Sequence, residues 1–487
     1  PIMGLPSVEL KFMRTITTFS SLYLATLFML FANGLLTTYL ALDLEARGIT
    51  DILISSLTSA YYAGLVIGAK LGHKLIARVG HIRSYVASAG VTAATVILIG
   101  LLDYIEFWLA ARFIMGLMMM VQYMVIESWL NDQAEPTQRG IVFGIYMAVS
   151  SLGVLLGQVA LTVIEPIDIR ILMIVSMFFS LCLVPLAVTR AIHPTPLKAA
   201  PLNMGYFIKT LPQVLIITLF AGMMVGSFYG LGPIFATRLG LDTQEAGSYM
   251  AIAIAASLII QWPLGLLSDR MNRLLLITIV AILLLTLSIL INLPWITNLY
   301  IALISFFAIA LQFTLYPLSV AIANDNIDED KRVSLSAILL MLFGVGAAIG
   351  PLISGYLMER YDARGLYLFT LAIAIAIIWM NLLKASRRLK TDVEDSLPHV
   401  ILPDGHLSPI AAATLDPRID EDAVIEAMHN EEAEEIKEAL REEIEAAEIE
   451  KKKSKIERNA LLPFGEYSYA AFLQEYGAPV TPKEKDE

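Results

Sequence analysis

The chain has 487 residues, of which 57% are hydrophobic and only 16% are charged. Soluble domains carry about 25% charged residues, so this composition excludes an ordinary soluble globular protein. The net charge of −11 comes largely from acidic residues near the C-terminus, and no basic excess supports nucleic-acid binding. The composition therefore predicts that most of the chain contacts a lipid bilayer.

Long apolar runs define the expected elements. A helix needs about 20 apolar residues to cross a bilayer, and these runs are too continuously apolar for barrel strands. The sequence predicts an all-α membrane protein with about 12 transmembrane helices, the first of them retained rather than cleaved. The single cysteine, Cys182, is expected to be a core residue. We place the helices at 17–42, 52–76, 84–102, 107–130, 141–163, 169–189, 213–236, 246–267, 274–293, 299–322, 333–357 and 365–384.

Basic residues concentrate in alternate loops, whereas the other loops carry acids such as Asp43, Glu45 and Asp51. Because cytoplasmic loops are enriched in Lys and Arg, we expect both termini to lie inside a bacterial inner (cytoplasmic) membrane. The expected segments are a cytoplasmic N-terminus at 1–16, a six-helix bundle at 17–189, a cytoplasmic linker at 190–212, a second six-helix bundle at 213–384 and a cytoplasmic acidic tail at 385–487.

An internal repeat relates the two bundles with a period of about 193 residues. With six helices in each unit, both repeats take the same membrane orientation, so the repeat is parallel. The matched features are Asn131-Asp132 with Arg139 and Asn324-Asp325 with Arg332, Gly153/Gly157 and Gly346/Gly350, Tyr123 and Tyr316, and the segments 77–80 and 269–272.

Several of these motifs resemble the major facilitator superfamily over roughly residues 15–390. The segment 265–273 is similar to the family's loop motif between the second and third helix of a half, with Asn272 at a position where we expect a positive φ. Arg112 with Gly116 resembles the family's RxxxG pattern, and the segments 80–83 and 125–132 look most like its YcaD-like bacterial branch. The resemblance implies a secondary transporter that works by alternating access of two bundles.

The resemblance also implies a gate at the inner end of the helix 246–267. A carboxylate at Asp269 could cap the next helix or pair with a cation across the two bundles, and a contact present in only one state biases a two-state equilibrium. Alternatively, this loop only determines topology. The gating candidates are Asp269, Arg270, Arg273, Arg78, Arg83, Asp132, Arg139, Asp325 and Arg332.

Ionisable side chains inside membrane helices are costly and are functional by default, and Lys70, Arg112 and Glu127 stand out. On the helix 107–130, Arg112, Met119, Tyr123 and Glu127 fall along one stripe, which we expect to face a central cavity. Arg112 could hold an anionic substrate group or a relay carboxylate.

Glu127 is the candidate for proton coupling, because a carboxyl that is partly withdrawn from water can carry a proton at physiological pH. The alternative is a structural pair of Glu127 with Lys70, Lys74 or Arg139. Other polar or aromatic side chains near the middle of the membrane could line the site or bond a neighbouring helix. These are Asn33, Gln122, Gln158, Tyr229, Gln261 and Gln312.

The sequence carries no nucleotide-binding loop, metal-ligand cluster or nucleophile–base pair, so we expect neither an enzyme nor a cofactor. The favoured function is proton-coupled efflux of a small organic solute. Proton symport in the uptake direction is the first alternative. The second is a non-transporting membrane adaptor acting through the acidic tail, where a long helix at about 420–460 could recruit a soluble protein or self-associate.

Overall fold

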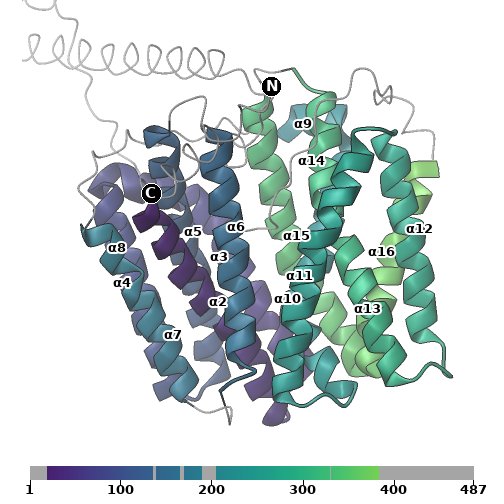
Figure 1. Ribbon diagram of the computed structural model, residues 1–487, viewed down its shortest axis with the longest axis horizontal. Coiled ribbons are helices and arrows are strands. Elements are labelled where there is room, and N and C mark those ends of the chain that lie inside the picture. The colour runs from purple at the N-terminus through teal and green to yellow at the C-terminus, as the bar shows by residue number, and fades with distance from the viewer. Residues whose placement is uncertain (1–18, 135–138, 165–168, 189–203, 329–330, 383–487) are drawn as a thin grey trace, which may run out of the picture. The chain divides into compact units, whose positions relative to one another are not determined.

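The computed structural model describes residues 19–134, 139–164, 169–188, 204–328 and 331–382, and within them every regular element is helical. One group of helices covers the first half of the described chain and a second group covers the rest; the two lie beside each other (Figure 1). The first helix group comprises α2 (Ser20–Ala46), α3 (Asp51–Val79), α4 (His81–Leu101), α5 (Ile105–Gln133), α6 (Arg139–Ala160), α7 (Arg170–Leu181) and α8 (Leu183–Val188). After the short α9 (Met204–Thr210), the second helix group comprises α10 (Pro212–Arg238), α11 (Thr243–Ser268), α12 (Arg273–Asn292), α13 (Asn298–Gln312), α14 (Leu315–Asp325), α15 (Arg332–Tyr361), the 3₁₀ turn η3 (Asp362–Arg364) and α16 (Gly365–Leu382).

The helices fall where the apolar runs predicted them, with two differences of continuity. The run 169–189 forms α7 and α8, and the run 299–322 forms α13 and α14. Pro185 and Pro317 lie in the first turn after each break. Proline has no N–H for the carbonyl four residues earlier and its ring clashes with that carbonyl, so the helix is interrupted there. Each run is still one stretch able to cross a membrane, Arg170–Ala187 and Asn298–Asp325, as predicted. The helix expected at about 420–460 lies outside the described residues.

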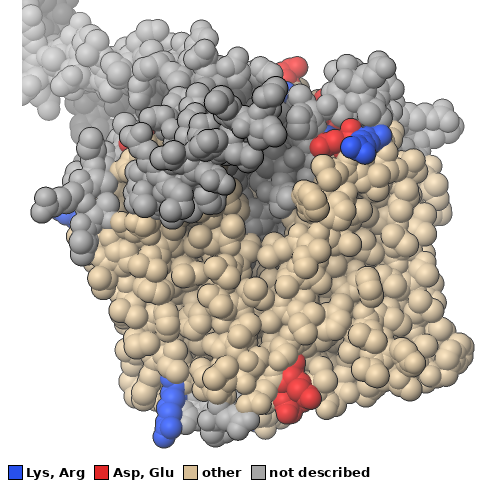
Figure 2. Space-filling view, viewed as in Figure 1, with Lys and Arg blue, Asp and Glu red and all other residues tan. Residues whose placement is uncertain are grey.

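The described chain contains 11 stretches that are long and apolar enough to cross a membrane, and the last of them, Ser334–Leu382, has 49 residues and holds both α15 and α16. Large apolar side chains are exposed on the outside of the helices, among them Ile259, Phe307 and Trp379. In the described part of the face in Figure 2, charged side chains lie at the two ends of the helices, with an uncharged band between them. These features identify a multi-pass membrane protein.

Small residues allow the closest helix contacts inside each group. A Cβ at Gly157 would lie 2.5 Å from the Phe31 carbonyl oxygen, so α6 packs backbone to backbone on α2. A Cβ at Gly346 would lie 2.1 Å from the Leu219 carbonyl oxygen, and α15 packs on α10 in the same way. The small-residue spacing seen in the sequence therefore marks tight helix contacts. Gly144 differs, because a Cβ there would meet nothing within 4 Å.

The two helix groups contact each other through α3 with α15 and α10, α2 with α10, and α6 with α11. We call the end where α3 begins and α10 finishes the Asp51 end, and the end where α5 finishes and α6 begins the Arg139 end. At the Asp51 end, a Cβ on Gly355 would lie 2.4 Å from the Ser55 hydroxyl oxygen. Near the middle of the same two helices, a Cβ on Gly344 would lie 2.7 Å from Val66. The contact between the groups thus extends from the Asp51 end toward mid-depth.

Candidate functional site

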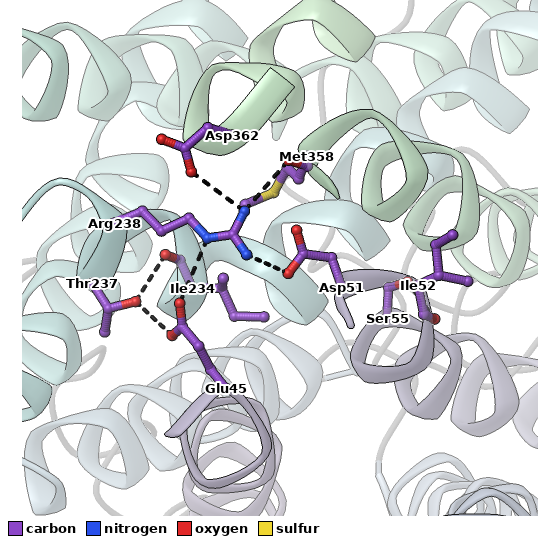
Figure 3. A network of polar contacts seen from close by, with 9 residues as sticks. All are labelled: Glu45, Asp51, Ile52, Ser55, Ile234, Thr237, Arg238, Met358 and Asp362. Atoms are coloured by element: carbon purple, nitrogen blue, oxygen red, sulfur yellow. Dashed lines mark hydrogen bonds and ion pairs between the residues drawn. The ribbon is translucent and has the colours of Figure 1, made fainter. Parts of the chain in front are cut away.

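A cluster of charges joins the two helix groups at the Asp51 end (Figure 3). We call it the Arg238 cluster: Glu45, Asp51, Thr237, Arg238 and Asp362. The Arg238 guanidinium lies 2.6 Å from Asp51 Oδ1, 3.7 Å from Glu45 Oε1 and 3.5 Å from Asp362 Oδ1. The Thr237 hydroxyl donates to Glu45 Oε2 at 2.5 Å. Two carboxylates of the first group and one cation of the second group are therefore held together.

Burial gives these ion pairs unequal weight. The Asp51 side chain is 2% exposed and that of Arg238 is 25% exposed, whereas Asp362 is 76% exposed. An exposed ion pair contributes little because water and salt screen it, so the Asp51–Arg238 pair dominates. Sequence reasoning placed these residues in loops and missed the cluster. The only indication in the sequence was an arginine at the end of one apolar run and two acids in the loop after another run.

A small pocket lies next to the Arg238 cluster, inside the first helix group. We call it the Arg112 pocket, and its cavity volume is about 10 Å³, room for about one water molecule. Glu45 follows directly after one of its lining residues, and Asp51 lies one helical turn before another. The pocket is lined by Thr37, Leu40, Ala41, Leu44, Ile54, Leu57, Thr58 and Arg112.

Arg112 is 1% exposed and lies in the second turn of α5, so its charge is removed from water. Its Nη2 donates to the Thr37 hydroxyl at 3.2 Å, and its guanidinium carbon lies 4.5 Å from the centre of the Tyr61 ring. Among the described residues, Nε and Nη1 have no hydrogen-bond partner, and no carboxylate pairs with this arginine.

Magnitudes show that these contacts leave Arg112 under-compensated. A desolvated cation–π contact contributes about 2 kcal/mol. Each buried donor left without an acceptor costs about 1–3 kcal/mol, and more when it is charged. Two such donors on one guanidinium outweigh the ring contact, so the site as it stands favours an additional acceptor.

Glu127, on the same helix, is fully buried, and its Oε1 accepts a hydrogen bond from the Tyr146 hydroxyl at 3.0 Å. One residue further along α5, the Ser128 hydroxyl lies 3.2 Å from His81 Nε2. Fifteen residues of helix separate Glu127 from Arg112, a rise of about 22 Å, so Glu127 is too far away to serve as a relay carboxylate for Arg112. Lys70 and Lys74 are exposed.

The remaining residues of the expected stripe, Met119 and Tyr123, are completely buried. Two of the polar candidates bond neighbouring helices: Gln158 accepts from Thr38 at 2.6 Å and donates to the Gly34 carbonyl at 3.2 Å. Gln122 donates to Thr92 of α4 at 3.3 Å. The others, Asn33, Gln261 and Gln312, are buried, and Tyr229 is half-buried and packs on Phe228 and Phe313.

At the Arg139 end, Arg273 joins three helix ends of the second group. It lies 2.7 Å from Asp325 of α14 and 3.2 Å from Asp269, which directly follows α11. The Asn272 side chain caps α12 by accepting from the Leu275 amide, with φ −54°. The expectation of a positive φ at Asn272 was therefore wrong, since here an N-cap side chain replaces the left-handed turn.

The other gating candidates also lie at helix ends. Arg78 and Arg83 are exposed on either side of Gly80, whose φ is +86°. Asp132 is exposed near the end of α5, and Arg139 begins α6. Arg332 begins α15 and is 6% exposed.

Comparison with known proteins shows the family of the chain. The sequence model of the Major Facilitator Superfamily matches residues 22–338 and 293–411. The chain belongs to the Major Facilitator Superfamily. Among its relatives are the uncharacterized MFS-type transporter YcaD of Escherichia fergusonii, 27% identical over 75% of this chain and 94% of that protein, and YE1530 of Yersinia enterocolitica, 28% identical over 73% and 92%. It lies in the YcaD-like branch of the superfamily.

Solved transporters share the fold. The nucleoside transporter NupG superposes with a TM-score of 0.64 at 16% identity, covering 75% of this chain and 99% of that one. A bacterial homolog of the human lysosomal transporter Spinster gives 0.63 at 15% identity, covering 78% and 98%. Membership of the superfamily makes this chain a secondary transporter rather than an enzyme.

Proposed function

We propose that this chain exports a small organic solute across the bacterial inner membrane by proton-coupled alternating access. Twelve spans form two parallel six-helix repeats, at about 17–189 and 213–384, with both termini in the cytoplasm. The linker at 190–212 joins them on the cytoplasmic side. The direction of export rests on Gly144, Gly153 and Gly157, whose spacing resembles the fifth-helix glycine motif of antiporters, although Gln158 stands where that motif has Pro. Proton symport into the cell is the alternative.

Equivalent packing in the two helix groups supports the repeat. Gly157 packs α6 on α2, and Gly350, 193 positions later, packs α15 on α10, where its Cβ would lie 2.1 Å from the Met223 carbonyl oxygen. Gly34 of α2 and Gly226 of α10 occupy corresponding places on the facing helices. The length of the stretch 334–382 supports counting α15 and α16 as separate spans, since one span needs about 20 residues.

The Arg238 cluster is the main observation that supports alternating access. It joins carboxylates of one helix group to a cation of the other, so it can exist only while the groups touch at the Asp51 end. The loops at this end are poor in Lys and Arg, which supports an outward-facing location. We assign it as the outer gate, closed in this conformation. Opening must break these ion pairs, and the energy that they supply sets the balance between the two states.

At the Arg139 end, Arg273 pairs with Asp269 and Asp325 and so holds the ends of α11, α12 and α14 together. Asp132 and Arg139 lie at helix ends of the first group, and Arg332 begins α15 of the second. Arg78 and Arg83 lie at the adjoining ends of α3 and α4, and Arg270 lies between α11 and α12. We propose that this set determines how readily the cytoplasmic side closes, by exchanging partners as the groups approach.

Glu127 is the proposed proton carrier. Its hydrogen bond from Tyr146 and its contact with water both affect whether the carboxyl holds a proton, and both change as helices move. The proposed solute contacts are Met119, Tyr123, Asn33, Tyr229, Gln261 and Gln312. Gln122 and Gln158, the other two candidates, bond neighbouring helices in this conformation. The adaptor alternative would act through the tail, which lies outside the described residues.

The test uses purified full-length protein. Solutes that raise its thermal stability are first identified, since a ligand that binds the folded state stabilises it. Right-side-out proteoliposomes loaded with such a solute should then lose it faster when the outside is acidified. Accumulation under the same gradient would establish symport instead. Flux that ignores the gradient contradicts proton coupling, and the absence of flux for every solute that stabilises the protein supports the non-transporting adaptor.

A further inference from the structure

We infer that the outer gate is also a proton-binding site: when the Arg238 cluster closes, Asp51 and Glu45 take up one proton between them from the outer side. This inference rests on the proposed outer gate and adds the residues that hold a proton there. It follows from the number of acids that closure brings together, the number of cations that face them and the loss of water.

Two carboxylates share one edge of the Arg238 guanidinium (Figure 3). Nη2 lies 2.6 Å from Asp51 Oδ1, and Nε, on the same edge, lies 3.7 Å from Glu45 Oε1. Such an edge has the geometry that binds a single carboxylate through two parallel hydrogen bonds. Here each carboxylate places only one oxygen against it, so two like charges lie side by side at one cation.

The second oxygen of Asp51 is not compensated. The side chain is 2% exposed, and Oδ2 has no hydrogen-bond partner among the described residues. The second oxygen of Glu45 differs, since it accepts from the Thr237 hydroxyl at 2.5 Å. A buried anionic oxygen without a donor is costly. A proton on Oδ2 removes the charge and leaves Oδ1 able to accept from Arg238.

The nearby positive charges do not balance both carboxylates. Arg238 supplies one unit of charge against two. Arg47, two residues after Glu45, pairs instead with Asp43 at 2.9 Å and with Asp103. The N-terminal end of α3 favours a negative charge, but a helix end carries only about half an elementary charge. The closed cluster therefore retains an excess of negative charge.

Closing also brings further acids to the cluster. Glu359 of α15 and Asp362 of η3 repel the Asp51 carboxylate, and Asp362 also repels Glu45. Both of these acids are exposed, so water and salt screen them in part. Closure thus adds one cation and two partly screened anions while it withdraws Asp51 from water. Two acids that share such a site favour holding one proton between them.

Proton uptake on closing determines the sign of the pH effect. The closed gate binds more protons than the open gate, in which both carboxylates are in water. Acid therefore favours the closed gate and alkali favours the open one. In an exporter, a carrier that has released its solute outside binds this proton as it closes and returns to the inward-facing state.

The test measures closure of the gate as a function of pH in the full-length protein. Spin labels at the exposed positions Tyr104 and Leu299 report the distance between the helix groups in a Cys182→Ser background. Glu127→Gln in the same background removes the other proposed proton carrier. From about pH 8 to about pH 5, the ratio of closed to open protein should rise about threefold to tenfold. This is the effect of one proton whose pKa differs by about half a unit to one unit between the states.

Matched variants locate the proton. Asp51→Asn and Glu45→Gln each leave one carboxylate for one guanidinium, so each should remove most of the pH dependence. Glu106→Gln, which changes an exposed acid in the first turn of α5, is the control and should keep the full pH dependence. If Asp51→Asn does not fold, Glu45→Gln still tests the inference.

A closed population that does not depend on pH, or that falls in acid, would overturn the inference. Equal pH dependence in the labelled parent protein and in both variants would also overturn it, by placing the titrating group elsewhere. Closure that follows the sodium concentration at constant pH, and not the pH, would indicate a metal cation instead. If Arg238→Ala opens the gate while pH has no effect, only the proton site is wrong. If Arg238→Ala leaves the distance unchanged, the outer gate itself is wrong.

Discussion

Loss of Arg238 should open the Asp51 end. Replacing Arg238 with Ala removes the cation that holds carboxylates of α2 and α3 against the second helix group. The buried Asp51 carboxylate is then left without this partner as long as the groups stay together. Separation of the groups at this end rehydrates it, so the substitution favours the open state over the closed one.

The size of the shift follows from the burial of each partner. Removing one member of a fully buried pair costs about 3–5 kcal/mol. The 25% exposure of Arg238 lowers that value, and the exposed Asp362 adds almost nothing. A change of about 1–3 kcal/mol in the balance between states is therefore expected, which corresponds to about fivefold to 150-fold in their ratio.

Distances between spin labels measure this ratio directly. Labels at Tyr104 and Leu299, both 68% exposed, report the separation of α5 and α13 at the Asp51 end in a Cys182→Ser background. Arg238→Ala should transfer population from the short to the long distance. Arg360→Ala, which removes an exposed arginine from α15, is the matched control and should change nothing.

An unchanged distance distribution in Arg238→Ala, or an equal change in the control, would refute the gate. The reversed pair Asp51→Arg with Arg238→Asp provides a stricter check. It should recover most of the short-distance population that either single substitution loses, because the ion pair is restored with opposite polarity.

Three further outcomes are expected. Gly346→Ala should lower the free energy of unfolding by about 1–3 kcal/mol, because its Cβ would meet a backbone oxygen. Gly144→Ala places its Cβ in open space and should be neutral or slightly stabilising. Thermal unfolding in detergent compares the two variants. Glu127→Gln should abolish the dependence of flux on the pH gradient while Tyr146→Phe only shifts its midpoint, and gradient-driven flux that survives in Glu127→Gln removes the proton role. Arg273→Ala should increase proteolytic or maleimide access at the Arg139 end, by releasing both carboxylates that it holds, and identical access in wild type and variant contradicts that role.

The positions of the helices could be predicted because the bilayer imposes one requirement on every span: enough apolar residues to cross it. Close packing could also be predicted, since Gly157 and Gly346 sit in a small-residue spacing that has few other uses in membrane helices. The helix breaks were less accessible. Pro317 signalled a disturbed helix, but Pro233 and Pro351 lie within continuous ones, so proline alone does not decide.

The candidate site was also only partly predictable from the sequence. Burial of Arg112 and Glu127 follows from their places in apolar runs. The partners of these residues do not, because Thr37, Tyr61 and Tyr146 lie on other helices and are found only through tertiary packing. The Arg238 cluster brings together three segments that are far apart in the chain, and a single sequence does not show which distant segments contact each other. Asn272 shows that local structure can be ambiguous as well, because an asparagine at this position could adopt a left-handed turn or cap a helix.

The most direct test of alternating access locks the Asp51 end shut. In a Cys182→Ser background, Glu45→Cys and Thr237→Cys place thiols where the two side chains now share a hydrogen bond of 2.5 Å. A short, reducible thiol crosslinker should stop transport of an identified solute, and reduction should restore it, whereas either single cysteine should be unaffected. Full transport by the crosslinked protein would show that the two helix groups need not separate there, and would contradict the proposed mechanism.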